Sequence, residues 1–293
     1  MPSFPEIECW LAVSVETAAG KKYEHLLGEE KAGAPTEVFT RLREVVSAAH
    51  EDARDRIRRL AGVSLDPLEA GNSKDPAAGY PEKLHIQTLK GYFGEVMAGV
   101  VAENLCPFGL ADWKVPAYLF RFHNVAFQQL AMLNETGAPA GKIPGRTGDD
   151  CLAFRRNGGG EIVGGLFCEA KCTGDHNSGM ISDAHEKSSL PNLLPVDLLQ
   201  LVEILDNSSD SAAKGWAEAL RQLHLRGIDA GSSFERIDQV TYICGRKPVK
   251  GGGKCWIPVD KPHHKYTAGR KLHVAEIHLN DVVEAIKKAY GVI

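Results

Sequence analysis

Two apolar segments around a glycine-rich stretch constrain the fold of this chain most. Residues 151–154 form a short apolar run, residues 155–160 include three glycines, and residues 161–172 form a longer apolar run. Two such runs joined by a glycine-rich turn are typical of a β-hairpin. With the turn centred on Gly158-Gly159, Asp150 lies opposite the segment Leu166–Glu169. Whether Gly164-Gly165 adds a bulge to the return strand stays open.

Charged residues mark the end of the hairpin that lies away from the turn. Asp149-Asp150 precedes the first strand, and the return strand ends in Glu169-Ala170-Lys171. Because side chains alternate along a strand, Glu169 and Lys171 share one face, whereas Asp149 and Asp150 point to opposite faces. Asp150 directly abuts the first strand and is therefore the favoured partner of Glu169. Asp149 remains the alternative.

Two carboxylates at one end of a hairpin predict a site for a divalent cation. Neighbouring carboxylates repel each other unless a cation neutralises them, and oxygen ligands with room for water suit Mg2+ or Mn2+. The ammonium group of Lys171 beside them could stabilise the charge of a phosphoryl transition state or orient the attacking water. A Glu-x-Lys triplet by itself is weak support, since such pairs are often solvated surface charges.

At these residues the chain resembles the PD-(D/E)xK nuclease superfamily, also called restriction-endonuclease-like. Its signature is an Asp at the start of one strand and Glu-x-Lys in the next, and the resemblance covers Leu84–Cys172 best. In several branches a Glu on the preceding helix adds a metal contact. Here Glu95 matches, because residues 83–105 carry apolar side chains every three to four positions, a helical spacing. The proline of the motif is matched only loosely by Pro144.

The resemblance implies an α/β fold with a central mixed sheet flanked by helices, and a Mg2+-dependent deoxyribonuclease. Asp150, Glu169 and the Ala170 carbonyl would bind the metal, Glu95 would contact it directly or through water, and Lys171 would position or activate water. The order of elements is also similar to the nuclease subunit of Hachiman-type antiphage systems, which works beside a helicase. The alternative is a non-catalytic protein that binds nucleic acid or a helicase, with a degenerate nuclease fold.

Composition limits the other functional classes. A chain of 293 residues with 43% hydrophobic and 25% charged residues can bury a full core. It contains no apolar run of transmembrane length and no signal-like start, so we expect a cytoplasmic protein that does not enter a membrane. The seven cysteines are scattered and lack paired Cys-x-x-Cys spacing, which favours reduced thiols over disulfides or zinc.

A basic segment between two predicted strands is a candidate DNA contact. The net charge of the chain is −4, which disfavours a generally basic nucleic-acid binder. Residues 245–272 nevertheless carry eight Lys and Arg against one acid, with Trp and Tyr between them. The phosphate-contacting candidates are Lys250, Lys254, Lys261 and Lys265. A solvated insertion is an equally good interpretation, and Arg54, Arg56, Arg58 and Arg59 at the end of a predicted helix are a second basic group.

The chain divides most naturally after a stretch rich in Gly, Pro, Asn, Ser and Asp at residues 71–81. We therefore predict an N-terminal α/β extension over residues 1–80 that packs on a nuclease-like core over residues 81–293. After the hairpin, residues 180–189 form a short predicted helix that carries His185 and Lys187. These two side chains could lie over the site, although one His and one Lys on a polar helix are usually surface residues.

Overall fold

The computed structural model describes residue 4 and residues 6–18, 22–60, 75–137, 148–208, 210–227, 233–248 and 253–292. A six-stranded sheet runs through it in the order β1-β2-β6-β5-β4-β3. The strands are β1 (Leu11–Thr17), β2 (Tyr23–Glu30), β3 (Cys151–Arg156), β4 (Ile162–Thr173), β5 (Glu235–Cys244) and β6 (Lys271–His278). The pairs β2·β6, β6·β5 and β5·β4 are parallel, whereas β1·β2 and β3·β4 are antiparallel. The predicted mixed α/β sheet is therefore confirmed.

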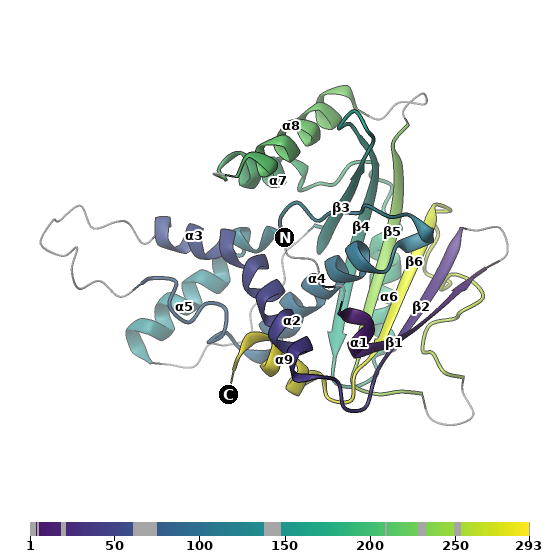
Figure 1. Cartoon of the computed structure of the whole chain (residues 1–293), viewed down its shortest axis with the longest axis horizontal. Coiled ribbons are helices and arrows are strands. Elements are labelled where there is room, and N and C mark those ends of the chain that lie inside the picture. Colours follow the sequence, from purple (N-terminus) through teal and green to yellow (C-terminus); the bar gives the residue numbers. More distant parts are fainter. Residues whose placement is uncertain are drawn as a thin grey trace, which may run out of the picture.

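The helices of the described residues cover both faces of this sheet (Figure 1). They are α1 (Ile7–Trp10), α2 (Thr36–Ala49), α3 (Glu51–Leu60), α4 (Ile86–Asn104), α5 (Asn124–Thr136), α6 (Ser178–Ser188), α7 (Leu198–Asp206), α8 (Ser211–Arg226) and α9 (Val282–Tyr290), with short 3-10 turns at Pro107–Gly109 and Leu119–Phe122. Helix α4 packs on β3, β4 and β5, and α6 packs on β4 and β5. No helix within these described residues is both long and apolar enough to cross a membrane.

The central strands are buried on both faces, as parallel strands between helix layers are. Every residue of β5 after Glu235 is buried, and so is every residue of β6 after Lys271. On one face, the sheet packs with α4 and α9 in a core that contains Cys168, Ile243 and Ile277. On the other face, the sheet packs with α6 in a core that contains Val240, Tyr242 and Val274. Glu169 and Lys171 belong to this second face.

The N-terminal segment is part of the sheet itself. Strand β2 pairs with β6 over seven residues, from Tyr23↔Leu272 to Glu29↔His278. Ahead of β2, the segment begins as the short helix α1 and continues as β1. Residues 71–74 of the predicted linker lie outside the described residues, and residues after them are packed, with Ala77 and Tyr80 buried. A boundary at residue 80 stays a prediction, but β1 and β2 share one sheet with the residues beyond it.

Helix α4 approaches its neighbours closely at two glycines. A Cβ on Gly94 would lie 3.4 Å from the Cβ of Ala170, which shows how near α4 comes to β4. A Cβ on Gly99 would lie 2.1 Å from the Tyr118 hydroxyl, which donates a hydrogen bond to the Val96 carbonyl at 3.1 Å. Alanine does not fit at Gly99 unless Tyr118 moves.

We expect Gly99→Ala to destabilise the chain by about 1–3 kcal/mol through overpacking, although alanine is the better helix former. Gly91 lies in the same helix, and a Cβ at that position would have no neighbouring atom within 4 Å, so Gly91→Ala is the matched control. It should stabilise the chain by roughly 0.5–1 kcal/mol. Urea unfolding of both variants measures the contrast, and equal effects would show that α4 and Tyr118 are not in this contact.

Candidate functional site

The predicted hairpin forms and brings Asp150 beside Glu169. Cys151 pairs with Cys168, and the Asp150 amide donates to the Cys168 carbonyl at 3.0 Å. The Asp150 carboxylate then accepts a hydrogen bond from the Ala170 amide at 2.8 Å. The register shifts between Arg155 and Arg156, where β4 contributes Val163 as the extra residue. The irregularity therefore lies one residue before Gly164-Gly165, and Asp150 keeps its place at the end of the strand pair.

Glu169 is 3% exposed and interacts with two lysines. The Lys171 ammonium lies 2.6 Å from Glu169 Oε1, as expected for side chains on one face of β4. Lys187 of α6 forms an ion pair with Glu169 Oε2, and its ammonium lies 3.8 Å from Asp150 Oδ1. Lys187 thus lies over the site, as its place on the predicted helix allowed. His185 is buried, and its Nδ1 instead bonds to the Ile181 carbonyl at 2.7 Å.

Burial dominates the electrostatics of this group. Burial and, after it, the charge of Asp150 raise the pKa of Glu169 to about 7, against the opposing effect of Lys187 and Lys171. Burial alone would lower the pKa of Lys187, but Asp150 and Glu169 together hold it above its usual value. The two acids therefore favour a nearby cation, and in this structure the Lys187 ammonium is the cation that both of them contact.

The same arrangement can accommodate a divalent cation. Asp150 keeps Oδ1 directed at the shared ammonium, because its Oδ2 is the atom that the Ala170 amide contacts. Two carboxylates that converge on one ammonium form a point where a metal could be held once Lys187 moves aside. Asp150 and Glu169 are the side chains that would hold it, and both are oxygen ligands of the kind that Mg2+ and Mn2+ prefer.

Asp149 lies just before β3, so strand alternation does not fix its direction. Burial raises its pKa to about 6, and the charges of Arg236 and Lys187 oppose that rise. Both of these cations belong to the α6 side of the sheet, so Asp149 is within electrostatic reach of the site. The prediction that Asp149 points to the face opposite Asp150 is therefore not supported by these charges. Asp150 accepts a hydrogen bond from the Ala170 amide of β4.

We expect Asp150→Asn to abolish metal-dependent DNA cleavage and Asp149→Asn to retain most of it. The reason is that Asp150 Oδ1 converges with Glu169 on one cation, while its Oδ2 is held by the Ala170 amide. Cleavage rates at saturating Mg2+ measure the difference. An inactive Asp149→Asn beside an active Asp150→Asn would mean that Asp149 is the first metal ligand.

Glu95 lies on α4, whose neighbouring Gly94 faces the Cβ atoms of Ala170 and Cys172. These Cβ atoms are on the face of β4 opposite to Glu169 and Lys171. Burial raises the pKa values of Tyr80, Tyr118 and Tyr290, and the negative charge of Glu95 raises each of them further. Glu95 is therefore placed near buried tyrosines, and its contact with a metal stays a prediction.

A buried ion-pair network beside the site has no motif in the sequence. Asp238 of β5 is fully buried and receives hydrogen bonds from Arg236 at 2.8 Å, Arg270 at 2.9 Å and Tyr266 at 2.6 Å. Arg270 also donates to the carbonyls of Ser188 and Leu190, at the end of α6. The network fixes the helix that carries Lys187. In the sequence this network is visible only as three charged residues, Glu235, Arg236 and Asp238, at the start of an apolar run.

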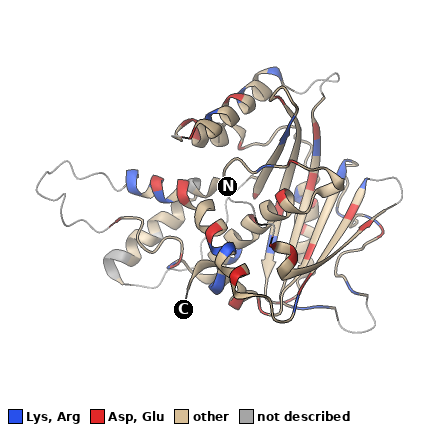
Figure 2. Ribbon diagram, in the orientation of Figure 1, with Lys and Arg blue, Asp and Glu red and all other residues tan. Residues whose placement is uncertain are grey.

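Several residues of the basic insertion form ion pairs with neighbouring strands and loops. Within the described part, Arg246 pairs with Asp175, Lys247 with Glu29, and Lys271 with Glu235. Among the predicted DNA contacts, Lys265 lies 3.9 Å from Glu186, and Lys254 and Lys261 are exposed. Lys250 and Pro144 lie outside the described residues. Helix α3 carries acidic as well as basic residues (Figure 2), and its Arg58 pairs with Asp55 and with Asp75.

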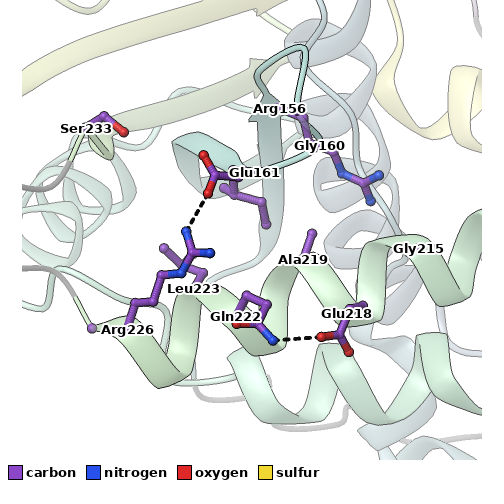
Figure 3. A pocket seen from close by; sticks show the side chains of 13 residues that line it. Arg156, Gly160, Glu161, Gly215, Glu218, Ala219, Gln222, Leu223, Arg226 and Ser233 are labelled. Carbon is purple, nitrogen blue, oxygen red and sulfur yellow. Dashed lines mark hydrogen bonds and ion pairs between the residues drawn. The ribbon is translucent and has the colours of Figure 1, made fainter.

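A pocket of about 660 Å3 lies between the hairpin turn and α8 (Figure 3). Its polar side chains largely pair with one another, since Arg226 contacts Glu161 at 2.6 Å and Gln222 contacts Glu218 at 2.8 Å. Glu161 precedes Glu169 by eight residues of extended chain, roughly 25 Å. The pocket is therefore remote from the carboxylates and is not the candidate site.

Comparison of the chain with known protein families finds no family that matches it, and comparison with curated proteins finds no significant match. The functional assignment accordingly depends on the geometry of Asp150, Glu169, Lys171 and Lys187.

Proposed function

We propose that the chain is a Mg2+- or Mn2+-dependent deoxyribonuclease with a restriction-endonuclease-like core, and that Asp150, Glu169 and Lys171 form its active site. The observation that carries the proposal is the convergence of Asp150 and Glu169 on one ammonium group, that of Lys187. Supporting it, the Glu-bearing helix α4, the acid before β3 and the Glu-x-Lys of β4 follow one another in the order that the superfamily uses.

The residues have distinct proposed roles. Asp150, Glu169 and the Ala170 carbonyl would hold the cation, whereas Glu95, on the helix that packs against the opposite face of β4, has no part in this proposal. A bound divalent cation would polarise the phosphate and lower the pKa of the attacking water. Lys171 lies on the same face as Glu169, where its ammonium orients that water or stabilises the charge that develops on the phosphate. Lys187 neutralises the carboxylates when no metal is bound.

The experiment is incubation of the purified chain with plasmid and linear DNA in Mg2+, in Mn2+, in Ca2+ and in excess chelator. We expect cleavage with Mg2+ or Mn2+ and none with chelator. DNA binding without cleavage under every metal would instead favour the non-catalytic alternative, in which Lys171 and Lys187 permanently neutralise the carboxylates.

The biological setting that this proposal favours is antiphage defence in the cytoplasm, with a helicase as partner. The support is the order of elements: an N-terminal α/β segment, the Glu-bearing helix, the acidic hairpin, and a closing strand and helix, β6 and α9. Co-purification of the chain with a helicase encoded beside it would test the partnership. A chain that protects cells from phage without any helicase would contradict it.

The basic insertion provides a proposed path for DNA. Lys254 and Lys261 are exposed and form no ion pair with a described residue. We expect alanine at Lys250, Lys254, Lys261 and Lys265 to weaken DNA binding and to lower the salt slope by about 0.9 for each duplex phosphate that is no longer neutralised. Replacing four exposed lysines elsewhere, Lys31, Lys214, Lys287 and Lys288, gives the same change of net charge. Equal slopes in the two variants would show that the insertion does not bind DNA.

A further inference from the structure

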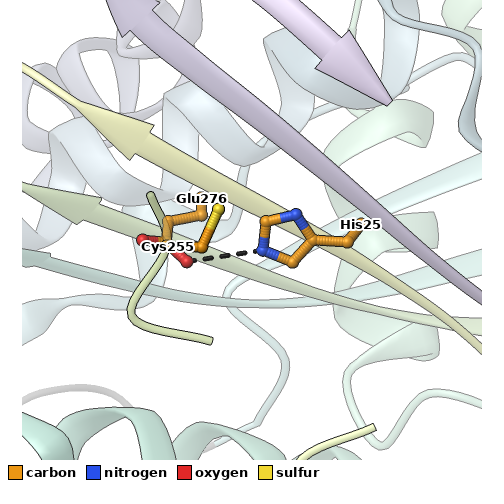
Figure 4. A group of neighbouring side chains, drawn as sticks. All are labelled: His25, Cys255 and Glu276. Atoms are coloured by element: carbon orange, nitrogen blue, oxygen red, sulfur yellow. Dashed lines mark hydrogen bonds and ion pairs between the residues drawn. The ribbon is translucent and has the colours of Figure 1, made fainter. Parts of the chain in front are cut away.

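A second group of potential metal ligands lies on β2, β6 and the insertion, on the far side of β5 from the hairpin. It consists of His25, Cys255 and Glu276, whose ligand atoms all lie within 4.8 Å of one another (Figure 4). His25 and Glu276 are buried, and Cys255 is partly exposed. His25 is far in sequence from Cys255 and Glu276, so its convergence with them is a property of the fold. In the described part of the chain they are the only group of this kind with three members.

The spacing within the group fits a tetrahedral ion better than a hydrogen bond. His25 Nε2 lies 3.4 Å from Glu276 Oε2, which is long for a charge-assisted hydrogen bond. With metal–ligand distances of about 2.0–2.1 Å, two oxygen or nitrogen ligands at a tetrahedral ion are separated by about 3.3 Å. The observed distance therefore matches the edge of such a site. Metal at Nε2 requires that the His25 ring carry its proton on Nδ1.

Neighbouring groups hold the Glu276 carboxylate in place. Its Oε1 accepts hydrogen bonds from the Trp256 amide at 2.7 Å and from His278 Nε2 at 2.6 Å. Its Oε2 accepts one from the Ile257 amide at 2.9 Å. These contacts fix the orientation of a ligand, as the outer contacts of protein metal sites do. They also place Cys255, which directly precedes Trp256, beside the carboxylate.

The ligand set indicates the metal. Imidazole nitrogen, thiolate sulfur and carboxylate oxygen together suit Zn2+, whereas Mg2+ and Mn2+ prefer oxygen alone. A thiolate and a carboxylate also balance the charge of the ion. His25 and Cys255 line a pocket of about 660 Å3 that Glu16, Lys254 and Asp260 share. A fourth position at the ion therefore faces open space in which water fits.

We propose that His25, Cys255 and Glu276 bind one Zn2+ ion whose fourth ligand is water from this pocket. The ion attaches the insertion, through Cys255, to two strands of the sheet. It is separate from the proposed Mg2+ site, which uses other residues and oxygen ligands only. Zinc binding consequently does not depend on nuclease activity, and either property can exist without the other.

The test is metal binding by the full chain after chelator treatment and reloading. We expect about one tightly bound Zn2+ per chain, and Co2+ in its place should give the thiolate-to-metal charge-transfer band of an ion that cysteine ligates. Cys255→Ser should abolish the band and most of the Zn2+ affinity. Cys106→Ser, at an exposed cysteine, is the matched control and should retain both. A persistent band in Cys255→Ser, or no retained metal in the unsubstituted chain, would overturn the proposal.

A second measurement needs no variant. Zn2+ should protect Cys255 from alkylation, whereas the exposed Cys9 and Cys106 should react equally with and without the ion. Mass spectrometry of the alkylated peptides reads out each thiol separately. Equal labelling of Cys255 in both conditions would contradict the site even if Cys255→Ser failed to fold.

Discussion

Glu169→Gln is expected to abolish metal-dependent DNA cleavage, with a loss of at least about a hundredfold to a thousandfold in rate. Glutamine keeps the volume of the side chain but removes the charge that would hold the cation opposite Asp150. The Lys171 ammonium, 2.6 Å from Glu169 Oε1, would also be left without its ionised partner. Single-turnover cleavage of a linear duplex at saturating Mg2+ measures the loss, separately from DNA affinity.

Stability distinguishes this effect from unfolding. Burial and the charge of Asp150 both disfavour the ionised form of Glu169, whereas the two lysines favour it, so the contributions to stability oppose each other. We therefore expect the melting temperature of Glu169→Gln to change by only a few degrees, about what 1 kcal/mol produces in a domain of this size. Glu161→Gln, at the exposed start of the same strand segment, is the control and should cleave normally. Full activity of Glu169→Gln would remove Glu169 from the active site.

The hairpin and its charged end could be predicted because every step depended on local sequence. Alternation placed Glu169 and Lys171 on one face, and the glycine-rich turn set the register that pairs Cys151 with Cys168. The parallel pairing of β2 with β6 could not be predicted in this way. It joins residues about 250 positions apart, and no local pattern encodes which buried strand lies next to which. Local sequence therefore predicts the N-terminal segment only as an extension, and its strands β1 and β2 join the sheet.

Local sequence predicts the candidate site only in part, for the same reason. Asp150, Glu169 and Lys171 lie in one hairpin, so their proximity follows from a turn. Lys187 reaches the carboxylates only because α6 packs back over β4, and Arg270 and Asp238 hold the end of that helix. His25, Cys255 and Glu276 come together through parallel pairing and an insertion, so the cysteine spacing that disfavoured zinc gave no signal of this group.

The two lysines at the site should behave differently. Lys171 is fixed on β4 beside Glu169, whereas Lys187 comes from α6 and contacts both carboxylates. If the catalytic divalent cation binds where the Lys187 ammonium now lies, Lys187 competes with that cation for Asp150 and Glu169. Lys171→Met should then lower the cleavage rate by about a hundredfold to a thousandfold at saturating Mg2+, because a charge aimed at the reacting phosphate is removed.

Lys187→Met should leave that maximal rate within about tenfold of the unsubstituted chain and should lower the Mg2+ concentration needed for half-maximal cleavage. The physical reason is that a neutral side chain leaves Asp150 and Glu169 without their bound ammonium, so a divalent cation no longer has to displace it. Titration of Mg2+ against single-turnover rate gives both quantities for each variant. Lys187→Arg is the control, because it keeps the charge and should retain a high Mg2+ requirement. The opposite outcome is a Lys187→Met variant that keeps its Mg2+ requirement and cleaves as slowly as Lys171→Met. It would show that Lys187 takes part in the reaction and does not occupy the metal position.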